Sequence, residues 1–450
     1  MQEKTSFSSK IGFVLAAAGS AVGLGNLWRF PYLAAKYGGG TFLFIYLILA
    51  ISFGFTLMLT EIAIGRHTGK SAVNAYRALD KRFSFVGYIG SLVPIIIFPY
   101  YCVIGGWVVK YLTVYLTGKA MPAAKDGFFE GFISNTSEPL IYLLIFIAAT
   151  AIIVAMGVEK GVEKFSKILM PFLVLLSIGI AIYVITIPGA MDGVIYYIKP
   201  DFSKVSVNAI LAALGQLFYS MSLAMGIMIT YGSYMKKEDD LESSVTQIEL
   251  FDTGIAFLAG LIIIPSVFAF SGGDESALNS GAGLMFITLP KVFASIKMSG
   301  LLGGAFFFLV LFAALTSSIS LMETVVSIVK EKTGFSRITT CVIVFIFSLI
   351  LAVPSSLGYG VLSGIQLLGL SILDFFDFIS NTILMPIVAL FTCILVGHVI
   401  KPDMIVDEVE MSGKFKRKKL YIVIIKYIAP LFLLAILISS ILNTFGIISL

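Results

Sequence analysis

The sequence predicts an all-α polytopic membrane protein with about eleven transmembrane helices, two of them broken at mid-membrane. Its residues are 58% hydrophobic and 13% charged, and the mean hydropathy is +1.00, whereas soluble domains carry roughly 25% charge. The apolar runs are about 20 residues long, which suits membrane-spanning helices rather than the shorter alternating strands of a membrane barrel. Two of these runs contain clustered glycines and polar residues, the pattern of interrupted helices.

Eleven apolar segments bounded by charge, glycine or proline follow one another along the chain. We expect them at residues 11–37, 41–65, 85–117, 139–157, 165–187, 206–234, 244–270, 300–329, 338–354, 363–399 and 421–447. The polar stretch 271–280 and the short apolar run 282–293, which contains Pro290, do not have the length to span. They are expected to form an external cap or re-entrant hairpin over a vestibule.

Lysine and arginine determine the predicted orientation. The loops that carry most of them follow segment 2 (Arg66, Lys70, Arg77, Lys81, Arg82) and precede segment 11 (Lys414, Lys416, Arg417, Lys418, Lys419). No charge lies between Pro354 and Leu362, after segment 9. The positive-inside rule therefore predicts a multi-pass protein of the cell inner (plasma) membrane, with the N-terminus in the cytoplasm and the C-terminus outside. An anionic-lipid site at 414–419 is the alternative interpretation of the second loop.

The first segment contains Gly19-Ser-Ala-Val-Gly-Leu-Gly-Asn-Leu-Trp-Arg-Phe-Pro31, in which glycines crowd beside Asn26 and Arg29. Each unpaired backbone group costs several kcal/mol in hydrocarbon. Irregular backbone at membrane depth is therefore stable only where protein or a water-filled cavity covers it. We predict a binding site at this break.

Segment 6 repeats the pattern between Gly215 and Gly226, and a second helical piece follows at 227–234. Two interrupted spans at matching places indicate an inverted-repeat transporter with its site near the bilayer midplane. We therefore expect one transmembrane domain over 1–450, with a first repeat at 1–200 (helices 1–5), a second at 201–400 (helices 6–10), and a basic cytoplasmic loop and helix 11 at 401–450. Glycines that merely allow close helix packing are the alternative.

A helix break presents amide N–H groups on one side and carbonyls on the other, so it can hold an anion and a cation together. An amino acid zwitterion with Na⁺ fits that pair. Asn26, Ser220, Ser222 and the hydroxyls of 316–318 add oxygens, with no cysteine or histidine nearby. Oxygen-only coordination suits a hard alkali cation. Serine and threonine in membrane helices also bond back to their own backbone, so that alternative stays open for each hydroxyl.

The charged residues that interrupt the apolar runs include Arg29, Glu61, Asp252, Glu323, Asp374 and Asp377. Intramembrane charges are expensive and face cavities or partners. Arg29 and Asp377 both fall on the outer halves of their segments, so they could pair across a vestibule as a gate. Asp374 shares a helix face with Asp377 and is the fallback partner. A static tie between helices is the alternative.

At this point the residues resemble the neurotransmitter:sodium symporter family. The motifs that carry the resemblance are Gly23-Leu-Gly-Asn-Leu-Trp-Arg-Phe-Pro31, Tyr100-Tyr101, Ile229-Thr-Tyr-Gly-Ser-Tyr234 and Leu315-Thr-Ser-Ser318. The resemblance covers essentially the whole chain. It is strongest to the prokaryotic amino acid transporter branch, which includes the leucine, multi-hydrophobic amino acid and tyrosine transporters of bacteria.

The resemblance implies two sodium sites, a substrate site and two gates. Sodium 1 would be held by Ala21, Asn26, Ser220 and Asp252, and sodium 2 by Gly19, Val22, Ala313, Thr316 and Ser317. The substrate would contact Ala21, Leu24, Gly25, Ile97, Tyr101, Tyr219, Ser220, Ser222, Met225, Ser318 and Leu321. The outer gate would consist of Arg29, Gln216 and Asp377, and the inner gate of Lys4, Ser233, Tyr234 and Glu331.

Several positions depart from the family pattern. Asp252 is a carboxylate near a place where relatives have a neutral sodium ligand, so it could replace chloride, and we predict that chloride is not required. Met225 replaces a frequent phenylalanine, and a flexible methionine predicts a pocket that accepts large side chains. Lys4 keeps a positive charge at the inner gate but lacks the guanidinium fork. A twelfth helix, which lies outside the transport core, is missing.

The sequence thus predicts sodium-coupled symport of a neutral hydrophobic or aromatic L-amino acid by alternating access. A sodium-dependent amino acid sensor shares every site residue and remains an alternative, as does, less well supported, a cation channel. We expect no enzyme: His67 and His398 sit at predicted cytoplasmic ends, and Cys102, Cys341 and Cys393 lie in apolar stretches. The sequence contains no basic patch with interleaved aromatic residues, so we expect no nucleic-acid partner. The oligomeric state is left open.

Overall fold

The computed structural model describes residues 6–272, 283–296 and 298–444, and within them helices joined by short loops make up most of the chain. The symbol η marks a short 3₁₀ or π stretch, most of which continue a neighbouring α-helix. The first half comprises α1 (Lys10–Ala21), η1 (Gly25–Arg29), α2 (Phe30–Lys36), α3 (Gly40–Leu49), η2 (Ala50–Gly54), α4 (Phe55–Thr68), α5 (Ala72–Leu79), η3 (Lys81–Phe83), α6 (Ser84–Leu116), α7 (Ala120–Ala123), α8 (Phe128–Ile133), α9 (Glu138–Ala155), η4 (Val158–Glu163), α10 (Lys164–Ile185) and α11 (Ala190–Ile198).

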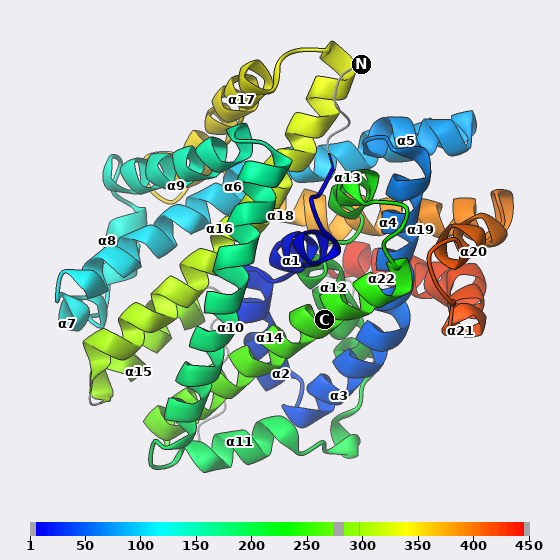
Figure 1. The fold of residues 1–450 in the computed structure, drawn as a ribbon. Coiled ribbons are helices and arrows are strands. Elements are labelled where there is room, and N and C mark those ends of the chain that lie inside the picture. Colours follow the sequence, from blue (N-terminus) through cyan, green and yellow to red (C-terminus); the bar gives the residue numbers. More distant parts are fainter. Residues whose placement is uncertain (1–5, 273–282, 297, 445–450) are drawn as a thin grey trace.

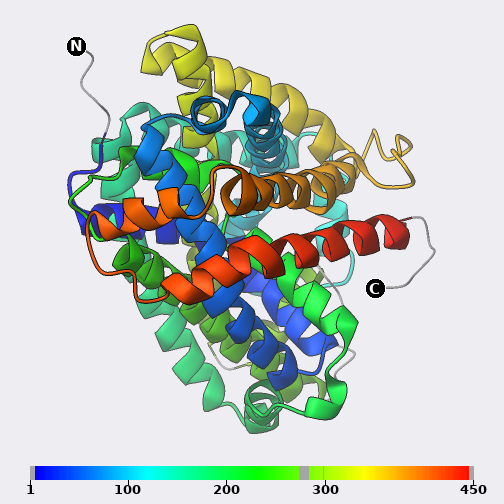
Figure 2. The same cartoon turned by 90° about the vertical axis from the view of Figure 1, so that its right-hand side faces the viewer.

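The second half comprises η5 (Phe202–Lys204), α12 (Val207–Ser220), α13 (Ile227–Tyr234), α14 (Leu241–Ser271), η7 (Leu284–Thr288), α15 (Leu289–Ser295), α16 (Ser299–Thr333), α17 (Arg337–Leu357), α18 (Ile372–Asp377), η8 (Phe378–Leu384), α19 (Met385–Ile394), η9 (Leu395–Val399), α20 (Asp403–Glu410), α21 (Lys418–Val423), η10 (Ile424–Ile428) and α22 (Ala429–Thr444). Figure 2 shows the chain from α19 through α20 to α22 along one side of the molecule.

Nine helices in the described residues are long and apolar enough to cross a membrane. A tenth span is formed by Lys10–Ala21 and Gly25–Lys36, which are bent by 51° at the predicted first break. The second break separates α12 from α13, neither of which has the length to cross alone. If these two pieces form one span, the total reaches eleven, and that total remains a prediction, as does the division into two five-helix repeats.

The predicted segment limits agree with the helices to within a few residues, except at segment 10. Its expected start at residue 363 is wrong, because the helix begins at Ile372. Residues 358–371 are apolar and uncharged but contain four glycines, and Leu368 and Gly369 have positive φ angles of 52° and 77°. Such left-handed backbone cannot continue a helix.

The broken helices lie at the centre of the molecule, and the longer helices surround them. α1 and α12 occupy the middle of Figure 1, with α6, α10 and α16 on one side and α4, α19 and α22 on the other. α1 packs against α10, α14 and α16. Its residues from Ala16 to Ala21 are all buried. A helix with no polar face of its own is suited to the protein interior rather than to the lipid boundary.

The short helical stretch 284–295 corresponds to the expected cap. Phe286 packs against Trp28, Trp107, Tyr111 and Phe129 with ring centroids 5.1 to 6.2 Å apart. Such aromatic pairs contribute about 0.5–1.5 kcal/mol beyond area burial. The stretch therefore covers the C-terminal part of α6, where Trp107 and Tyr111 lie. The polar part of the expected cap, 273–282, lies outside the described residues.

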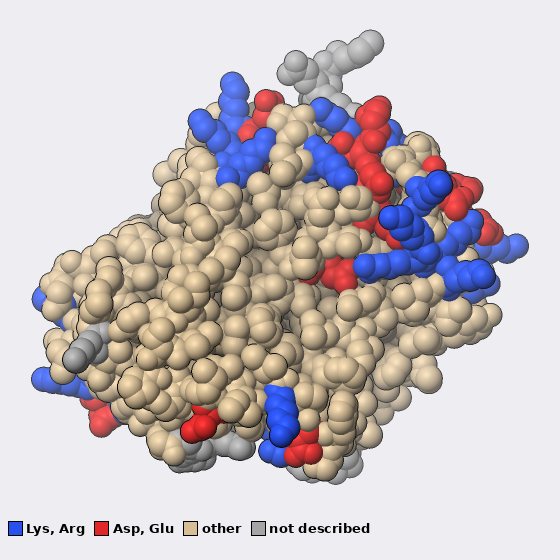
Figure 3. Space-filling view, turned by 60° about the horizontal axis from the view of Figure 1, so that its bottom comes forward, with Lys and Arg blue, Asp and Glu red and all other residues tan. Residues whose placement is uncertain are grey.

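Charged side chains are distributed as a membrane protein requires. On the face shown in Figure 3 most lysine, arginine, aspartate and glutamate residues gather toward the upper and right-hand edges. A smaller group lies at the opposite end, and uncharged surface fills the region between them. Exposed apolar residues on α9, α10 and α17, including Ile152, Leu175 and Ile350, face the region that the hydrocarbon would occupy.

Helices α4 and α13 are in close contact through two glycines. A methyl group at Gly65 would overlap the backbone carbonyl of Ile229, and one at Gly232 would overlap the backbone of Ile62. Small residues let membrane helices approach to backbone contact. α4 and α13 therefore behave as one packed unit beside the second break.

We expect Gly65→Ala to destabilise the protein by about 1–3 kcal/mol, the usual cost of overpacking. Gly254→Ala is the matched control, because a methyl group at Gly254 in α14 meets nothing within 4 Å. Thermal unfolding in detergent should show a lower midpoint for Gly65→Ala than for the unsubstituted protein. The midpoint of Gly254→Ala should not be lowered. Equal midpoints would contradict the close α4–α13 contact.

Candidate functional site

The first helix breaks because its amides turn away from their helical partners. Gly23 N donates to Asn26 Oδ1 at 3.0 Å, Leu24 N to the Tyr101 hydroxyl at 3.4 Å, and Asn26 N to Gly23 O at 3.2 Å. In an unbroken helix these amides would serve the carbonyls of residues 19, 20 and 22. Those three carbonyl oxygens therefore lack these backbone donors, and Ser20 O accepts the Ser222 hydroxyl instead.

The second break, between Ser220 and Ile227, contains strained backbone. Ser222 and Ala224 have positive φ angles of 53° and 60°, a conformation that costs of order 1–3 kcal/mol for a residue other than glycine. Glu61 on α4 stabilises it, because its Oε1 accepts the Ala224 amide at 2.7 Å. Ser222 Oγ also donates to Ser20 O at 2.9 Å, which joins the two breaks directly.

A small cavity lies between the two breaks. Its volume is about 30 Å³, well below the roughly 300 Å³ at which ligand pockets begin. An amino acid can enter only if side chains around it move. The residues that line the cavity are Ser20, Ala21, Gly23, Leu24, Gly25, Ile97, Tyr101, Tyr219, Ser220, Ser222, Met225, Ile227, Ser317 and Leu321.

This cavity brings together ten of the eleven predicted substrate residues. Ser318 is the exception, because its hydroxyl lies 2.9 Å from that of Thr150 on α9 and donates to the Leu315 carbonyl at 2.9 Å. Four lining residues were not predicted to contact the substrate, namely Ser20, Gly23, Ile227 and Ser317, of which Ser317 was predicted for sodium 2. Ser20, Gly23 and Ile227 lie at or beside the two breaks, so proximity to a break was the available signal.

Oxygen atoms converge where α16 meets the first break. Ser317 Oγ lies 3.4, 3.1 and 3.2 Å from the carbonyl oxygens of Gly19, Ser20 and Val22. A hydroxyl has one hydrogen and can donate to one of them. Thr316 Oγ1 lies 3.1 Å from Ala313 O on the same helix. Acceptors outnumber donors here, so the arrangement suits a hard cation bound by oxygen.

A second group of polar atoms surrounds Asp252, which is fully buried on α14. Its Oδ1 accepts hydrogen bonds from Asn26 Nδ2 and Ser220 Oγ, each at 2.7 Å. Its Oδ2 accepts one from the Tyr46 hydroxyl at 3.2 Å. Residues from η1, α3, α12 and α14 therefore meet at one carboxylate. A buried negative charge with these neighbours can pair with a cation.

Two of the predicted outer-gate residues, Arg29 and Asp377, lie near Tyr219. Arg29, Tyr219 and Asp377 line two further cavities of about 180 and 260 Å³. The Arg29 guanidinium stands 5.5 Å from the Tyr219 ring centroid. Asp377 instead accepts hydrogen bonds from Tyr100 at 3.0 Å and Asn381 at 2.6 Å.

Within the described part of the chain no ion pair joins Arg29 to Asp377, so their pairing remains a prediction for another state of the protein. Gln216, the third outer-gate residue, is buried and donates to Gly25 O at 2.9 Å. The fallback partner Asp374 accepts the Ser371 hydroxyl at 2.6 Å and helps to begin α18.

The predicted inner-gate residues lie at the C-terminal ends of α13 and α16. Tyr234 donates its hydroxyl to Glu323 at 3.0 Å, and Glu323 forms an ion pair with Arg337. Glu331 accepts the Ser71 amide and the Asn74 side chain, both at 2.8 Å. Ser233 Oγ donates to the Thr230 carbonyl at 2.6 Å. Lys4, the expected partner of Glu331, lies outside the described residues.

Comparison with known proteins agrees with this geometry. The family model described as "Sodium:neurotransmitter symporter family" matches residues 4–125 and 130–447. The chain belongs to the sodium:neurotransmitter symporter family. It is therefore a multi-pass membrane transporter of a sodium-dependent family, as the sequence motifs predicted.

Individual relatives support the assignment over the whole length. An uncharacterized sodium-dependent transporter of Haemophilus influenzae is 35% identical over 98% of both chains. The human sodium- and chloride-dependent GABA transporter 2 is 27% identical over 72% of this chain and 62% of its own. The crystal structure of MhsT in complex with L-phenylalanine superposes with a TM-score of 0.88 and 37% identity, over 97% of this chain and 99% of that one.

We expect Ser317→Ala to weaken sodium binding about tenfold, because it removes one oxygen from a cluster that a cation would complete. Thermal stabilisation titrated with sodium chloride would measure the change. Ser266→Ala is the matched control, since this buried hydroxyl on α14 donates only to its own helix, at Ile262 O. An unchanged sodium midpoint in Ser317→Ala would exclude the oxygen cluster as a cation site.

Proposed function

We propose that this protein is a sodium-coupled symporter that imports a neutral hydrophobic or aromatic L-amino acid by alternating access. The observation that carries the proposal is the meeting of two helix breaks at one buried cavity, where carbonyl oxygens exceed the donors available to them. Backbone amides on the other side of the first break supply sites for an anion. An amino acid zwitterion and a cation together would satisfy both the carbonyl oxygens and the backbone amides.

The substrate would bind with its carboxylate toward the amides of Leu24 and Gly25 and the Tyr101 hydroxyl. Its ammonium would face the carbonyls of the two breaks, at Ala21, Tyr219, Ser220 and Ser222. The side chain would lie against the apolar wall formed by Ile97, Met225 and Leu321, which line the cavity. The L-phenylalanine in the 37% identical MhsT structure supports a large apolar side chain.

Two sodium ions would accompany the substrate. The first would lie among Ala21, Asn26, Ser220 and Asp252, and the second among Gly19, Val22, Ala313, Thr316 and Ser317. The first ion would also contact the substrate carboxylate, so each would complete the other's coordination and favour the other's binding. Asp252 supplies a fixed negative charge within 2.7 Å of Asn26 and Ser220, which makes a mobile chloride unnecessary.

Alternating access would require the two gates to close in turn. Arg29 and Asp377 would pair when the outside closes, with Gln216 fixed below them. Lys4 and Glu331, with Ser233 and Tyr234, would separate when the inside opens. At a membrane potential of 100 mV each positive charge moved inward supplies about 2.3 kcal/mol, so one net charge supports substantial accumulation.

Membrane topology and environment follow from the same proposal. The N-terminus would lie in the cytoplasm and the C-terminus outside the inner (plasma) membrane, because the basic loops mark the cytoplasmic face. A sensor that binds without transporting would use the same residues. A channel would conduct without substrate. Both alternatives are separated from a symporter by uptake measurements.

Radiolabelled L-phenylalanine should accumulate in proteoliposomes under an inward sodium gradient and not under an equal potassium gradient. Binding without accumulation would identify a sensor, and sodium current without substrate would identify a channel. Asn26→Ala should weaken both sodium and substrate binding, each about tenfold, because Asn26 belongs to the shared shell. Sodium dependence of uptake that Asn26→Ala leaves unchanged would contradict the shared-site arrangement.

Uptake should also persist when gluconate replaces chloride on both sides of the membrane. We expect Asp252→Asn to lower sodium affinity and uptake by about tenfold or more, because the buried charge that opposes the cation is removed. Uptake by the wild-type protein and by Asp252→Asn is measured in chloride and in gluconate. Wild-type uptake that falls sharply without chloride would overturn the role given to Asp252.

A further inference from the structure

A group of lysines near the last membrane-spanning helix has no acidic partner. Within the described part of the chain no ion pair includes Lys414, Lys416, Lys419 or Lys426, which lie between the end of α20 and η10. Their cationic neighbours differ. Arg417 pairs with Glu249 at 3.1 Å, and Lys418 pairs with Glu410 at 3.0 Å. Unpaired positive charge gathered in one place attracts an anionic partner.

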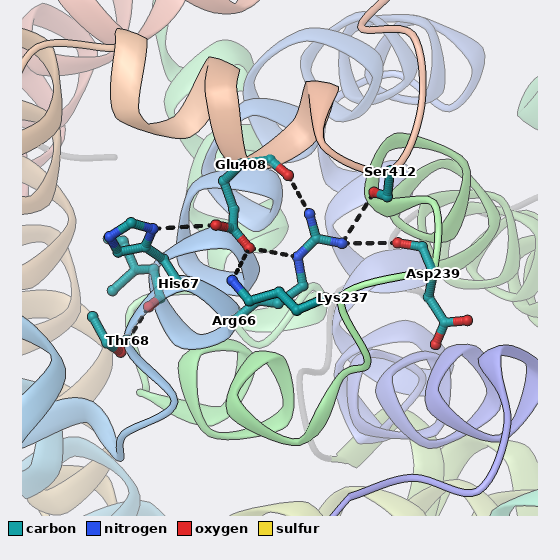
Figure 4. Close-up of polar contacts among 8 residues, drawn as sticks. Arg66, His67, Thr68, Lys237, Asp239, Glu408 and Ser412 are labelled. Atoms are coloured by element: carbon teal, nitrogen blue, oxygen red, sulfur yellow. Dashed lines mark hydrogen bonds and ion pairs between the residues drawn. The ribbon is translucent and has the colours of Figure 1, made fainter.

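The helix that precedes these lysines is held against the rest of the protein. Figure 4 shows Glu408 of α20 pointing between Arg66 and Lys237, whose nitrogens lie 2.8 and 2.7 Å from its Oε1. Arg66 also donates to Ser412 Oγ at 3.2 Å, just after α20. Because Arg66 belongs to α4 and Lys237 follows α13, α20 is attached to two separate parts of the chain.

The turn after α20 is fixed as well. Glu242 on α14 accepts the amides of Lys416 and Arg417 at 2.7 and 3.1 Å. Phe415 is buried, and its ring centroid lies 5.4 Å from that of Tyr421. The lysines on either side of Phe415 are exposed. The backbone is therefore anchored while the lysine side chains face outward.

The acidic residues of α20 leave the positive charge in excess. Burial by itself raises the pKa of Glu408, but the hydrogen bond from Lys237 and the charge of Arg66 hold the pKa below its usual range. The charge of Glu408 is thus matched inside the protein. Asp403 and Asp407 are exposed, and they precede all four lysines in the chain. Four unpaired lysines outnumber these two carboxylates.

Lys426 lies at the depth where the membrane boundary is expected. A methyl group at Gly397 would lie 3.3 Å from the Lys426 Cα, and Gly397 is near the end of the apolar span Ile372–Val399. Lys426 is therefore level with the last turn of that span, although its own span begins at Lys418. A lysine at this depth extends its amine toward the polar edge of the bilayer.

An apolar stripe begins beside the lysines. Along α21, η10 and α22 the exposed residues Leu420, Val423, Tyr427, Leu431, Leu434 and Ile438 repeat at helical spacing. Figure 2 shows these helices along one side of the molecule. Tyr427 is 64% exposed, and tyrosine is enriched where a membrane meets water. One surface thus offers cations at its end and hydrocarbon contact beyond them.

We propose that Lys419 and Lys426, together with Tyr427, form a binding site for the head group of an anionic phospholipid whose acyl chains lie along the apolar stripe. A zwitterionic lipid carries a cation of its own and gains less from the lysines. A soluble acidic partner could reach Lys414 and Lys416, but Lys426 is level with an apolar span. The site is separate from the transport cavity and does not depend on the proposed symport.

The test places a reporter at the site with Tyr427→Trp and reconstitutes the protein in mixed phosphatidylcholine and phosphatidylglycerol bilayers, with one of the two lipids brominated. Emission of the native tryptophans, recorded without the substitution, is subtracted. Brominated phosphatidylglycerol should quench the reporter with a relative binding constant about fivefold or more above that of brominated phosphatidylcholine, since one lysine near an anionic head group contributes about that factor.

The double variant Lys419→Gln with Lys426→Gln, in the reporter background, should bring the ratio close to one. Lys160→Gln with Lys164→Gln is the matched control, because these two exposed lysines of η4 and α10 carry the same charge, and it should leave the preference in place. Equal quenching by the two lipids in the reporter protein would overturn the proposal. So would a preference that survives the loss of Lys419 and Lys426, or one that the control pair lowers equally, which would indicate only the overall surface charge.

Discussion

The structure depends on satisfying backbone groups that two helices release inside the membrane. No water is available there to replace a missing partner. The protein satisfies the released groups with Asn26 and Tyr101 at the first break and Glu61 at the second. Ser222 then joins the breaks across the cavity. Carbonyls near Ser317 have too few donors for all of them, and this remaining deficit is what a cation with an amino acid can fill.

Two buried carboxylates serve this constraint differently. One carboxylate oxygen of Glu61 accepts a hydrogen bond from the Ala224 amide, and the other has no hydrogen-bond partner among the described residues. Asp252 has donors on both oxygens, from Asn26, Ser220 and Tyr46. Both residues interrupt apolar runs in the sequence and carry the same formal charge. The structure separates a carboxylate that stabilises backbone from one that faces the predicted ion site.

The sequence predicts the spans and the breaks well, because hydrophobic length and clustered glycines are local signals. The predicted site residues come from the family motifs, and ten of the eleven predicted substrate residues line one cavity. The direction in which a side chain points depends on residues that are far away in the sequence. Ser318 turns toward Thr150, and Asp377 bonds Tyr100 rather than Arg29, since packing between distant helices selects each rotamer. Glu331 likewise bonds Ser71 and Asn74 at the start of α5, a contact that no spacing rule reveals.

Tyr219 links the size of the substrate to the outer gate. Its ring lines the small central cavity and both outer cavities, and the Arg29 guanidinium stands over that ring. The central cavity has room for about one water molecule, so an amino acid fits only after lining side chains such as Tyr219 move. Movement of Tyr219 also moves the surface on which Arg29 rests. Under the proposed function, a substrate large enough to displace Tyr219 would therefore also free Arg29 to pair with Asp377, and selectivity would arise from closure as well as from contact.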